Sequence, residues 1–409
     1  MKKIGIVSLG YAWMPCEPGP SRFYYIAKLF AEHGYEVEVI TSDFQHFQKK
    51  RRDMDTIYRQ NYPFKLSFIK VPPYKKNIDP RRVYSNRVAV SRVVSHLKNH
   101  TYDAVYCSIP ANDIAAKVGQ YCKKRGIPFI IDIEDLWPEA MQMVVKLPVI
   151  KQLIFAYFRR DAETAYKCAD AVIGTSDDYT NRAFLHQQRD ICKATVYVGC
   201  DMDIFEQGAK DYVQEIDKPK DEFWVTYAGS LGTSYDIRTM ILSAAEIQKE
   251  RNSQGRKICF KILGTGPMKA ELEELCKSSG CKNVEFLGYV AYPKMAAYLV
   301  QSDVLINSFV KGAPQSIVNK VGDYLAAGKP MINTLENPEF VQLVDRQNFG
   351  CNIEPENVAA LTNAICRYEQ DIRLTSEQGQ CARKTAQEMF DRKVSYRRIL
   401  EITEQVMEH

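Results

Sequence analysis

The chain has 409 residues, of which 45% are hydrophobic and 26% are charged, the composition of an ordinary globular protein of two or three domains. This composition excludes disordered, collagen-like and fibrous proteins. The formal net charge is only +5, but residues 45–100 contain fourteen Lys and Arg residues and only three Asp residues. Such a local excess indicates a charged surface with a function.

Twelve cysteines are scattered along the chain without a Cys-x-x-Cys pair. Their spacing fits neither a disulfide framework nor a zinc site, and it favours a reducing, cytosolic environment. The apolar run near the N-terminus ends at residues 11–15 without the small-residue cleavage site of a signal peptide. No run reaches the roughly 18 apolar residues of a membrane span, so any membrane contact is expected to be peripheral.

The first half alternates between predicted strands and helices. A buried strand at 3–9 precedes a Gly/Pro-rich loop, a helix capped by Ser21 and a strand at 37–41. Such alternation predicts a mostly parallel, doubly wound sheet. The next predicted elements are a strand at 104–107, a helix at 113–124, a strand at 128–132, a helix at 149–167 and a strand at 171–175.

A polar stretch at 207–222 is interpreted as an interdomain linker, after which the pattern restarts. We therefore expect an α/β protein with two Rossmann-like domains, 1–206 and 223–385, that face a central cleft where a ligand would touch the carboxyl ends of both sheets. Residues 386–409 are expected to form a helix that packs back on the first domain. In the second half we expect strands at 223–228, 258–263, 284–287, 304–307 and 330–333, and helices at 237–250, 268–278 and 317–327.

The segment from residue 311 to residue 330 is the most informative. At 100° per residue, Ser316, Asn319, Lys320 and Asp323 share one face of a predicted helix, opposite an apolar face. The helix N-terminus near Ser316 would lie at the carboxyl end of the sheet, where free backbone N–H groups favour an anion. A diphosphate there would leave Asp323 near a ribose, whose hydroxyls could donate to its carboxylate. The alternative is a surface helix with a solvated polar face.

Several motifs carry a family resemblance. The run VNKVGDYLAAGKPMI at 318–332 resembles a segment of family 4 glycosyltransferases, which have the GT-B fold of two Rossmann-like domains. The run DIEDLWPE at 132–139 is similar to the DxRDLWPES of bacterial enzymes that transfer N-acetylated amino sugars, including fucosaminyl transferases. The resemblance covers nearly the whole chain, since other matches follow in order: VGCDMDIF at 198–205, YAGSLG at 227–232, ILGTGPMKAEL at 262–272 and VEFLGYVAYPKMAAYLVQSDVLI at 284–306.

The resemblance implies transfer of a sugar from a nucleotide diphosphate to an acceptor hydroxyl, with retention at the anomeric carbon. It implies no required metal or other cofactor, and UDP is favoured over GDP as the nucleotide of the donor. The family has an E-x7-E signature whose second Glu holds the ribose. The matching positions here are Gln315 and Asp323, so the first keeps hydrogen bonding without charge and the second keeps a carboxylate on a shorter arm.

A cation is expected beside the diphosphate, because the leaving group gains negative charge in the transition state. The family usually places Arg and Lys shortly after the glycine turn of the second half, but GSLGTSYDIR at 229–238 has only Arg238. Lys269 and Lys320 are the remaining candidates, with a solvated lysine as the alternative for each. The other donor-site candidates are Gly19, Gly229, Ser230, Gly266, Ser316, Ile317 and Asn319.

Acidic residues occupy the position where the family often has a His-Asp pair whose His reaches the donor sugar. Glu134 and Asp135 are the candidate catalytic residues there, and the alternative is a set of acids that complements a helix dipole. No protein nucleophile is expected, since the departing phosphate can accept the acceptor's proton. The Asp-x-Asp triplets at 53–55 and 201–203 are discounted as metal sites, and the six His show no metal-ligand spacing.

The basic segment from Phe44 to Lys98 mixes cations with aromatic residues, a composition typical of a face that meets anionic lipid head groups. The alternative is a solvated variable loop. No nucleic-acid motif accompanies the segment, so no nucleic-acid partner is expected. The acceptor or membrane candidates are Arg22, Lys49, Lys50, Arg51, Arg52, Lys75, Lys76, Arg81 and Arg82.

These features together predict a cytoplasmic enzyme, peripheral on the inner face of the cytoplasmic membrane. It would add a sugar, with an N-acetylated amino sugar as one candidate, to a lipid-linked saccharide in surface polysaccharide synthesis. Two alternatives stay open. One is a nucleotide-sugar 2-epimerase of the same fold, which consumes no acceptor, and the other is a non-catalytic nucleotide-sugar binding or partner protein.

Overall fold

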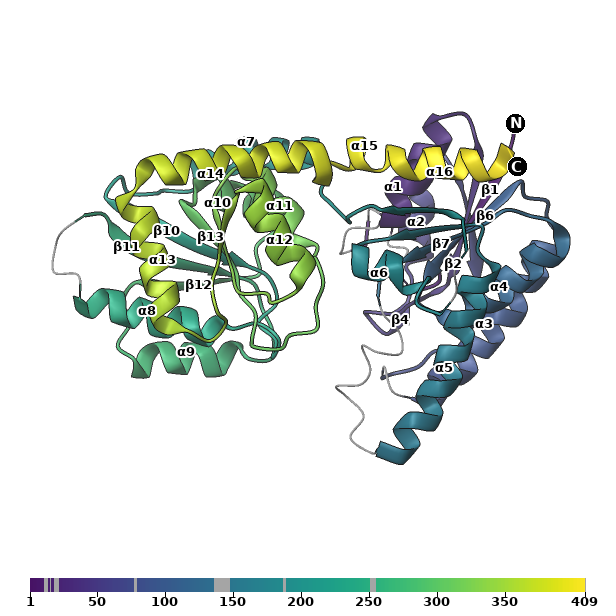
Figure 1. The fold of residues 1–409 in the computed structure, drawn as a ribbon, viewed down its shortest axis with the longest axis horizontal. Helices are drawn as coiled ribbons and strands as arrows, with labels where there is room; N and C mark the ends of the chain where they lie inside the picture. Colours follow the sequence, from purple (N-terminus) through teal and green to yellow (C-terminus); the bar gives the residue numbers. More distant parts are fainter. Residues whose placement is uncertain are drawn as a thin grey trace. The chain divides into compact units, whose positions relative to one another are not determined.

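The computed structural model describes residues 1–10, 14, 16–17, 22–76, 79–135, 148–186, 189–250 and 255–408, with backbone alone at 148–155, 157 and 250. The chain divides into two compact units (Figure 1). The first comprises Met1–Val196 and Tyr396–His409, and the second comprises Tyr197–Ser395.

The first unit is built on a seven-stranded parallel sheet with the order β5-β2-β1-β6-β7-β8-β9. The central strands β6 and β7 are buried along their whole length, as expected for a parallel sheet with both faces covered. The strands are β1 (Lys3–Val7), β2 (Glu36–Ser42), β5 (Lys65–Ile69), β6 (Ala104–Ile109), β7 (Phe129–Ile133), β8 (Ala171–Gly174) and β9 (Cys192–Thr195), with a small hairpin of β3 (Phe44–Gln45) and β4 (Lys50–Arg51).

Helices cover both faces of this sheet. On one face α1 and the C-terminal helix α16 contact each other and contribute Phe23, Phe30 and Ile399 to one core cluster (Figure 1). On the other face α3, α4 and α5 bury Val93 and Val118 with neighbouring residues in a second cluster. The helices are α1 (Arg22–Glu32), α2 (Met54–Arg59), α3 (Pro80–Lys98), α4 (Asn112–Arg125), α5 (Pro148–Cys168), α6 (Asp177–Arg182) and α16 (Arg397–Glu408).

The second unit has a six-stranded parallel sheet with the order β12-β11-β10-β13-β14-β15. In each sheet the chain builds outward in one direction from its first strand, β1 or β10, and then crosses to the other side of that strand, which is the arrangement of the Rossmann fold. The strands are β10 (Glu222–Ala228), β11 (Lys257–Leu263), β12 (Val284–Gly288), β13 (Val304–Asn307), β14 (Met331–Asn333) and β15 (Gly350–Asn352). The helices are α7 (Met202–Tyr212), α8 (Ile237–Glu250), α9 (Lys269–Ser278), α10 (Tyr292–Gln301), α11 (Lys320–Ala326), α12 (Pro338–Gln347), α13 (Val358–Gln370), α14 (Ile372–Thr385) and α15 (Arg392–Ser395).

The boundary between the units differs from the expected linker. It lies between residues 196 and 197, whereas 207–222 lies inside the second unit. The polar stretch is partly helical, because α7 buries Phe205 and Ala209 against α10 and exposes its polar residues. The C-terminal segment returns to the first unit at Tyr396, ten residues later than the predicted start of a returning helix at 386.

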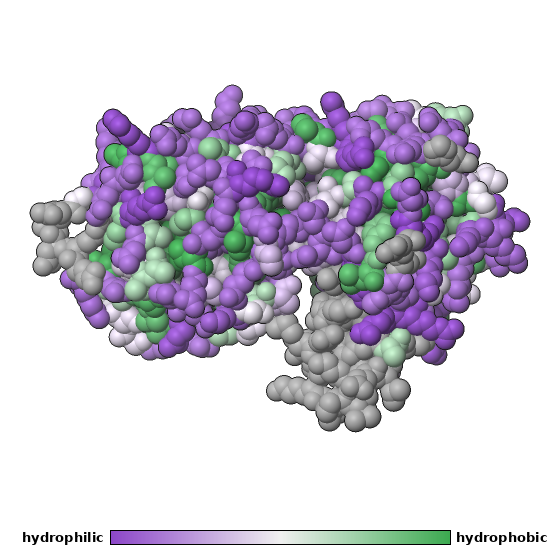
Figure 2. Space-filling view, in the orientation of Figure 1, coloured by the Kyte–Doolittle hydropathy of each residue, from purple (hydrophilic) through white to green (hydrophobic). Residues whose placement is uncertain are grey.

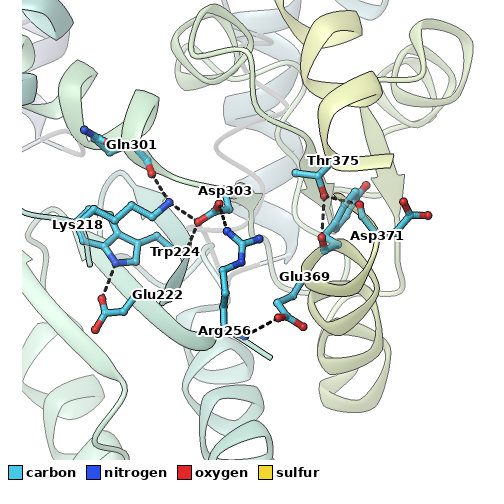
Figure 3. Close-up of polar contacts among 10 residues, drawn as sticks. Lys218, Glu222, Trp224, Arg256, Gln301, Asp303, Glu369, Asp371 and Thr375 are labelled. Carbon is cyan, nitrogen blue, oxygen red and sulfur yellow. Dashed lines mark hydrogen bonds and ion pairs between the residues drawn. The ribbon is translucent and has the colours of Figure 1, made fainter. Parts of the chain in front are cut away.

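A hydrogen-bonded cluster closes the amino end of the second sheet (Figure 3). The carboxylate of Asp303 accepts hydrogen bonds from Lys218 Nζ (2.5 Å), Arg256 Nη1 (3.0 Å) and the backbone N–H of Trp224 (2.7 Å). Lys218 Nζ also donates to the carbonyl oxygen of Gln301 at 2.8 Å. The end of the polar stretch is therefore fixed to the sheet on which the donor-site candidates stand.

Candidate donor site and acidic site

Two glycine turns, after β10 and after β11, lie against each other at the carboxyl end of the second sheet. Gly264 has a φ of +137°, and a Cβ there would lie 1.8 Å from the carbonyl oxygen of Gly229. A Cβ at Gly266 would lie 2.4 Å from the carbonyl oxygen of Leu231. Glycine is therefore required at both positions, because any side chain would collide with the backbone of the other turn. Ser230 is exposed, so a ligand can approach the main chain at this turn.

The helix α11 is fixed to the end of β10. The hydroxyl of Tyr324 accepts a hydrogen bond from the N–H of Ala228 (2.7 Å) and donates one to its carbonyl oxygen (3.1 Å). The helix starts at Lys320, and Asn319 before it makes no side-chain cap. The expected helix N-terminus near Ser316 is therefore wrong, because the residues before Asn319 form an irregular segment that leads into a helix of seven residues.

Lys320 is enclosed by aromatic rings. Its Nζ lies 4.3 Å from the ring centroid of Tyr227, 4.9 Å from that of Tyr235, 5.1 Å from that of Phe309 and 5.8 Å from that of Tyr324. This nitrogen is buried and has no hydrogen-bond partner among the described residues. Burial lowers the pKa of Lys320 to about 7, because the charged form loses its hydration.

Further unpartnered polar atoms gather at this end of the sheet. Native structures leave few such atoms, so their concentration indicates that a partner such as a ligand belongs there. In the described part of the second unit, Asn283 Oδ1 is the one such atom that lies elsewhere. Those at the carboxyl end are Asp236 Oδ2, Asn307 Oδ1, Gln315 Oε1, Ser316 Oγ and Lys320 Nζ.

Asp323 lies one helical turn beyond Lys320. Its Oδ1 accepts a hydrogen bond from the hydroxyl of Tyr292 at 2.7 Å. Burial raises the pKa of Asp323 to about 6, opposed by this hydrogen bond and by the charge of Arg392. Tyr292 is 36% exposed and was not a candidate from the sequence, although it stands in the family-like run at 284–306.

The remaining donor-site candidates differ in accessibility. Ile317 packs in the hydrophobic core, so only its main chain could meet a ligand. Asn319 is exposed. Lys269 begins α9, is 36% exposed and pairs with Glu273 at 3.6 Å, which is the geometry of an ordinary solvated lysine. Gly19 lies outside the described residues.

The acidic candidates of the first unit lie beside a buried ion pair at the end of β7. Asp132 Oδ2 accepts hydrogen bonds from Arg22 Nε (2.7 Å) and from the hydroxyl of Tyr106 (2.6 Å). The next acid, Glu134, has a buried Oε2 without a hydrogen-bond partner in the described ranges. Burial, reinforced by Asp132 and to a smaller extent by Asp135, raises the pKa of Glu134 to about 8, so this carboxyl is protonated at neutral pH.

Some basic candidates are structural. Arg22 is buried in its pair with Asp132, so its side chain does not lie on an exposed face. Arg52 is also buried, where it binds Glu17 and donates to the carbonyl oxygen of Ser42 at 2.8 Å. Both guanidinium groups satisfy carboxylates that are distant in sequence, which the basic composition of the segment did not reveal.

The other basic candidates lie at or near the surface of the first unit. Lys49 is partly buried, with its Nζ 5.4 Å from the ring centroid of Tyr74, and Arg82 lines a small pocket with the same tyrosine. The exposed candidates are Lys50, Arg51, Lys75, Lys76 and Arg81, of which Arg51 pairs with Asp43 at 2.5 Å.

The helix α3 presents an exposed cationic face. It contains no acidic residue, and Arg81, Tyr84 and Arg87 recur at three-residue spacing on its exposed side, followed by Lys98 at its end. On the face drawn in Figure 2, apolar residues form scattered patches within a mostly hydrophilic surface. In the described part of the chain, no helix has the length and apolar composition that crossing a membrane requires.

The two Asp-x-Asp triplets begin with helix caps. Asp53 accepts a hydrogen bond from the N–H of Thr56 at 3.1 Å, and Asp201 accepts one from the N–H of Ile204 at 3.1 Å. Each carboxylate thus satisfies a free N–H at the start of a helix. This local role explains both aspartates without a metal.

One group of possible metal ligands occurs within the described ranges, formed by Glu38, His96 and His100. The carboxylate of Glu38 is already hydrogen-bonded to His96 at 2.9 Å. The ammonium groups of Lys3 and Lys65 each lie 3.3 Å from it. Because two cations already neutralise this carboxylate, the group is poorly suited to a metal ion.

Comparison with known families and structures agrees with this architecture. Residues 21–196 match the family described as Glycosyltransferase Family 4, and residues 222–371 match the family described as Glycosyl transferases group 1. A curated relative, the putative colanic acid biosynthesis glycosyl transferase WcaI of Escherichia coli K12, is 27% identical over 154 residues. That alignment spans 37% of this chain and 36% of the relative, so it covers about a third of the relative's length.

Solved structures match over the whole chain at low identity. Sucrose-phosphate synthase from Thermosynechococcus elongatus has a TM-score of 0.73 at 16% identity, with all of both chains covered. HepE of Anabaena in complex with UDP has a TM-score of 0.69 at 17% identity, covering 100% of this chain and 99% of HepE. WaaG, a glycosyltransferase involved in lipopolysaccharide biosynthesis, has a TM-score of 0.67 at 16% identity, with 98% of this chain and 99% of WaaG covered. The chain therefore has the GT-B fold, and two glycosyltransferase family models match it one after the other, Glycosyltransferase Family 4 over residues 21–196 and Glycosyl transferases group 1 over residues 222–371.

Proposed function

We propose that this chain transfers a sugar from a UDP-linked donor to a hydroxyl of a lipid-linked saccharide in surface polysaccharide synthesis. The observation that carries the proposal is the set of unpartnered polar atoms at the carboxyl end of the second sheet, above all Gln315 Oε1, Ser316 Oγ and Lys320 Nζ. A nucleotide diphosphate would supply partners of the right kind, because its phosphate and ribose oxygens accept and its hydroxyls donate hydrogen bonds.

Asp323 suits the ribose in this arrangement. Its pKa of about 6 leaves it mostly ionised at pH 7.5, so the carboxylate can accept hydrogen bonds from two ribose hydroxyls. Tyr292, which already donates to one of its oxygens, would hold the carboxylate in place. The glycine turns would admit the diphosphate close to the main chain.

The proposed reaction retains the configuration at the anomeric carbon and needs no metal. The bond between the anomeric carbon and the diphosphate oxygen breaks, and the acceptor oxygen forms a bond with the same face of that carbon. The acceptor's hydroxyl proton passes to the departing phosphate oxygen, so no protein nucleophile takes part. In the first unit, the protonated Glu134 can donate a hydrogen bond to a sugar oxygen, and Asp135 stands beside it as an acceptor.

The relatives support the class of substrate. HepE has been crystallised with UDP and with UDP-glucose, which favours UDP as the nucleotide here. The name of WcaI refers to colanic acid biosynthesis, and WaaG is involved in lipopolysaccharide biosynthesis. An N-acetylated amino sugar is proposed as the transferred group on the resemblance of residues 132–139 alone.

The proposed location is the inner face of the cytoplasmic membrane, with α3 as the docking element. Its exposed cations, free of acidic neighbours on the same helix, suit an anionic lipid surface. Binding to vesicles that contain anionic lipid should fall in high salt and in the double variant Arg81→Glu with Arg87→Glu, while Lys277→Glu in the second unit should leave it unchanged. Salt-resistant binding, or equal loss in the control variant, contradicts docking through α3.

The transfer itself is tested by nucleotide release from a panel of UDP- and GDP-linked sugars, with and without membrane extract and with and without EDTA. Release of UDP that requires the extract and survives EDTA supports the proposal. Formation of an epimer without extract would identify a nucleotide-sugar epimerase instead. Nucleotide binding without turnover under every condition would exclude an enzyme, and inhibition by EDTA would overturn the metal-independent mechanism.

A further inference from the structure

The second unit holds Lys320 and Lys218 in opposite environments. Lys218 at the amino end of the sheet has a carboxylate and a carbonyl oxygen as acceptors (Figure 3). Lys320 at the carboxyl end has four aromatic rings around its Nζ and no acceptor among the described residues. Ring faces attract a cation, but they cannot accept the three strong hydrogen bonds that an ammonium group donates.

An ammonium group in such a cage is costly. Burial of a charged group without a hydrogen-bonded counter-ion carries a penalty of several kcal/mol, which a lysine avoids by losing its proton. Burial alone accounts for the lowered pKa of Lys320, about 7, with no charged side chain resolved as a contributor. The empty cage therefore favours the neutral amine at slightly alkaline pH.

The cage adjoins the turn proposed to meet the diphosphate. The Tyr227 ring lies 4.3 Å from Lys320 Nζ, and the Tyr227 hydroxyl lies 2.9 Å from where a Cβ on Gly229 would stand. Tyr324, another wall of the cage, is hydrogen-bonded to both backbone groups of Ala228, the residue before this turn. An anion on the turn would therefore lie close to the amine.

We propose that Lys320 is largely uncharged in the empty site and takes up one proton when the diphosphate binds, so that the cation of the donor site is created by its ligand. The inference rests on the proposed function and adds a linkage between donor binding and protonation. The proton comes from solvent. The new ammonium group then donates hydrogen bonds to phosphate oxygens, and the two opposite charges partly neutralise each other inside the site.

The neighbouring titratable groups leave a window in which this uptake can be measured. The cage tyrosines Tyr227, Tyr235 and Tyr324 all have pKa values raised by burial and stay neutral through pH 8. Asp323, on the same helix, has a pKa of about 6 and is ionised before that pH is reached. Between pH 7 and pH 8.5, Lys320 is therefore the group in this neighbourhood that changes charge.

The test is calorimetric titration of the intact protein with UDP in HEPES and in Tris, whose ionisation enthalpies differ, so that the difference in heat counts protons exchanged. A pKa of about 7 in the empty site predicts uptake of about 0.9 proton per UDP at pH 8. The dissociation constant should rise about fivefold between pH 7 and pH 8, because the protonated form binds better.

Two variants and a control separate the outcomes. Lys320→Met should abolish the uptake and weaken UDP binding at least tenfold, while Lys320→Arg should bind UDP without uptake, because guanidinium stays charged. Lys329→Met, which removes another lysine whose pKa burial lowers, should keep the uptake. UDP binding without uptake in the unaltered protein, or uptake that persists in Lys320→Met, overturns the inference and leaves the proposed function standing. Absence of UDP binding overturns both.

Discussion

Replacing Gly264 with alanine tests whether the two glycine turns pack closely and together form the surface proposed to bind the donor. The new methyl group would lie 1.8 Å from the carbonyl oxygen of Gly229, whereas an ordinary contact begins near 3.4 Å, so the turns must separate by more than an ångström. The φ of +137° adds strain of about 1–3 kcal/mol for a residue with a side chain. Overpacking adds a similar amount, so we expect a total loss of stability of about 2–6 kcal/mol.

The matched control is Gly280→Ala. This glycine has a φ of +70°, but a Cβ there would meet no atom within 4 Å, so only the backbone penalty of about 1–2 kcal/mol applies. Urea unfolding followed by circular dichroism measures both losses, and calorimetry of the folded variants measures UDP binding. Equal losses in the two variants would refute the close approach of the turns. A large loss of stability for Gly264→Ala with unchanged UDP affinity would show that the turns do not form the surface that binds the donor.

Three further predictions concern single carboxylates. Asp323→Ala should weaken UDP binding by about 2–3 kcal/mol, which is the contribution of hydrogen bonds to a charged group. The control Asp53→Ala removes a helix cap and should leave UDP binding intact. Equal losses of affinity for the two variants in calorimetry would overturn the assignment of Asp323 to the donor site. Asp303→Asn should destabilise the protein by about 2 kcal/mol, because Asp303 is only 14% exposed and pairs with two cations. Glu273→Ala, which breaks a surface ion pair, should lower the free energy of unfolding by less than about 0.5 kcal/mol. Urea unfolding measures both losses. Burial raises the pKa of Glu38, but hydrogen bonds from its neighbours together outweigh burial and lower the pKa to about 2. Its contribution to stability should therefore be full above about pH 4.5 and disappear as the pH falls toward 2. Unfolding midpoints of Glu38→Gln across this range should be less acid-sensitive than those of the unaltered protein, and unchanged acid sensitivity would contradict the assignment.

The parallel sheets were predictable because their central strands are buried on both faces. The strands at 104–109 and 129–133 are therefore nearly continuous apolar runs. The short strands at 192–195 and 350–352 were missed, since their positions are only partly buried and their sequences carry little pattern. The second part of the helix at 202–212 was taken for part of a linker because of its polar residues, although Met202, Phe205 and Ala209 of this helix are buried.

The relative positions of residues in the candidate donor site were predictable where they depend on the helical repeat alone. The spacing of Lys320 and Asp323 places them one turn apart, and both lie at the carboxyl end of the sheet in the structure. Their environment was not predictable, because the cage around Lys320 comes from residues up to 93 positions away in the sequence. The buried roles of Arg22 and Arg52 depend on partners 110 and 35 positions away, which composition cannot reveal.

The chain departs from the family pattern at Gln315 and in the missing Arg/Lys pair, and both departures remove charge from the candidate donor site. A glutamate in place of Gln315 would add a negative charge near the position proposed for a diphosphate, and it would also favour the charged form of a lysine nearby. With a neutral amide at that position, the empty site contains neither a fixed carboxylate there nor a permanently charged ammonium at Lys320. The absence of an Arg/Lys pair after the glycine turn has the same effect, since Arg238 is exposed on α8. The diphosphate would therefore meet an uncharged amine at Lys320 and generate its own counter-ion there, which avoids the desolvation of a preformed buried ammonium group.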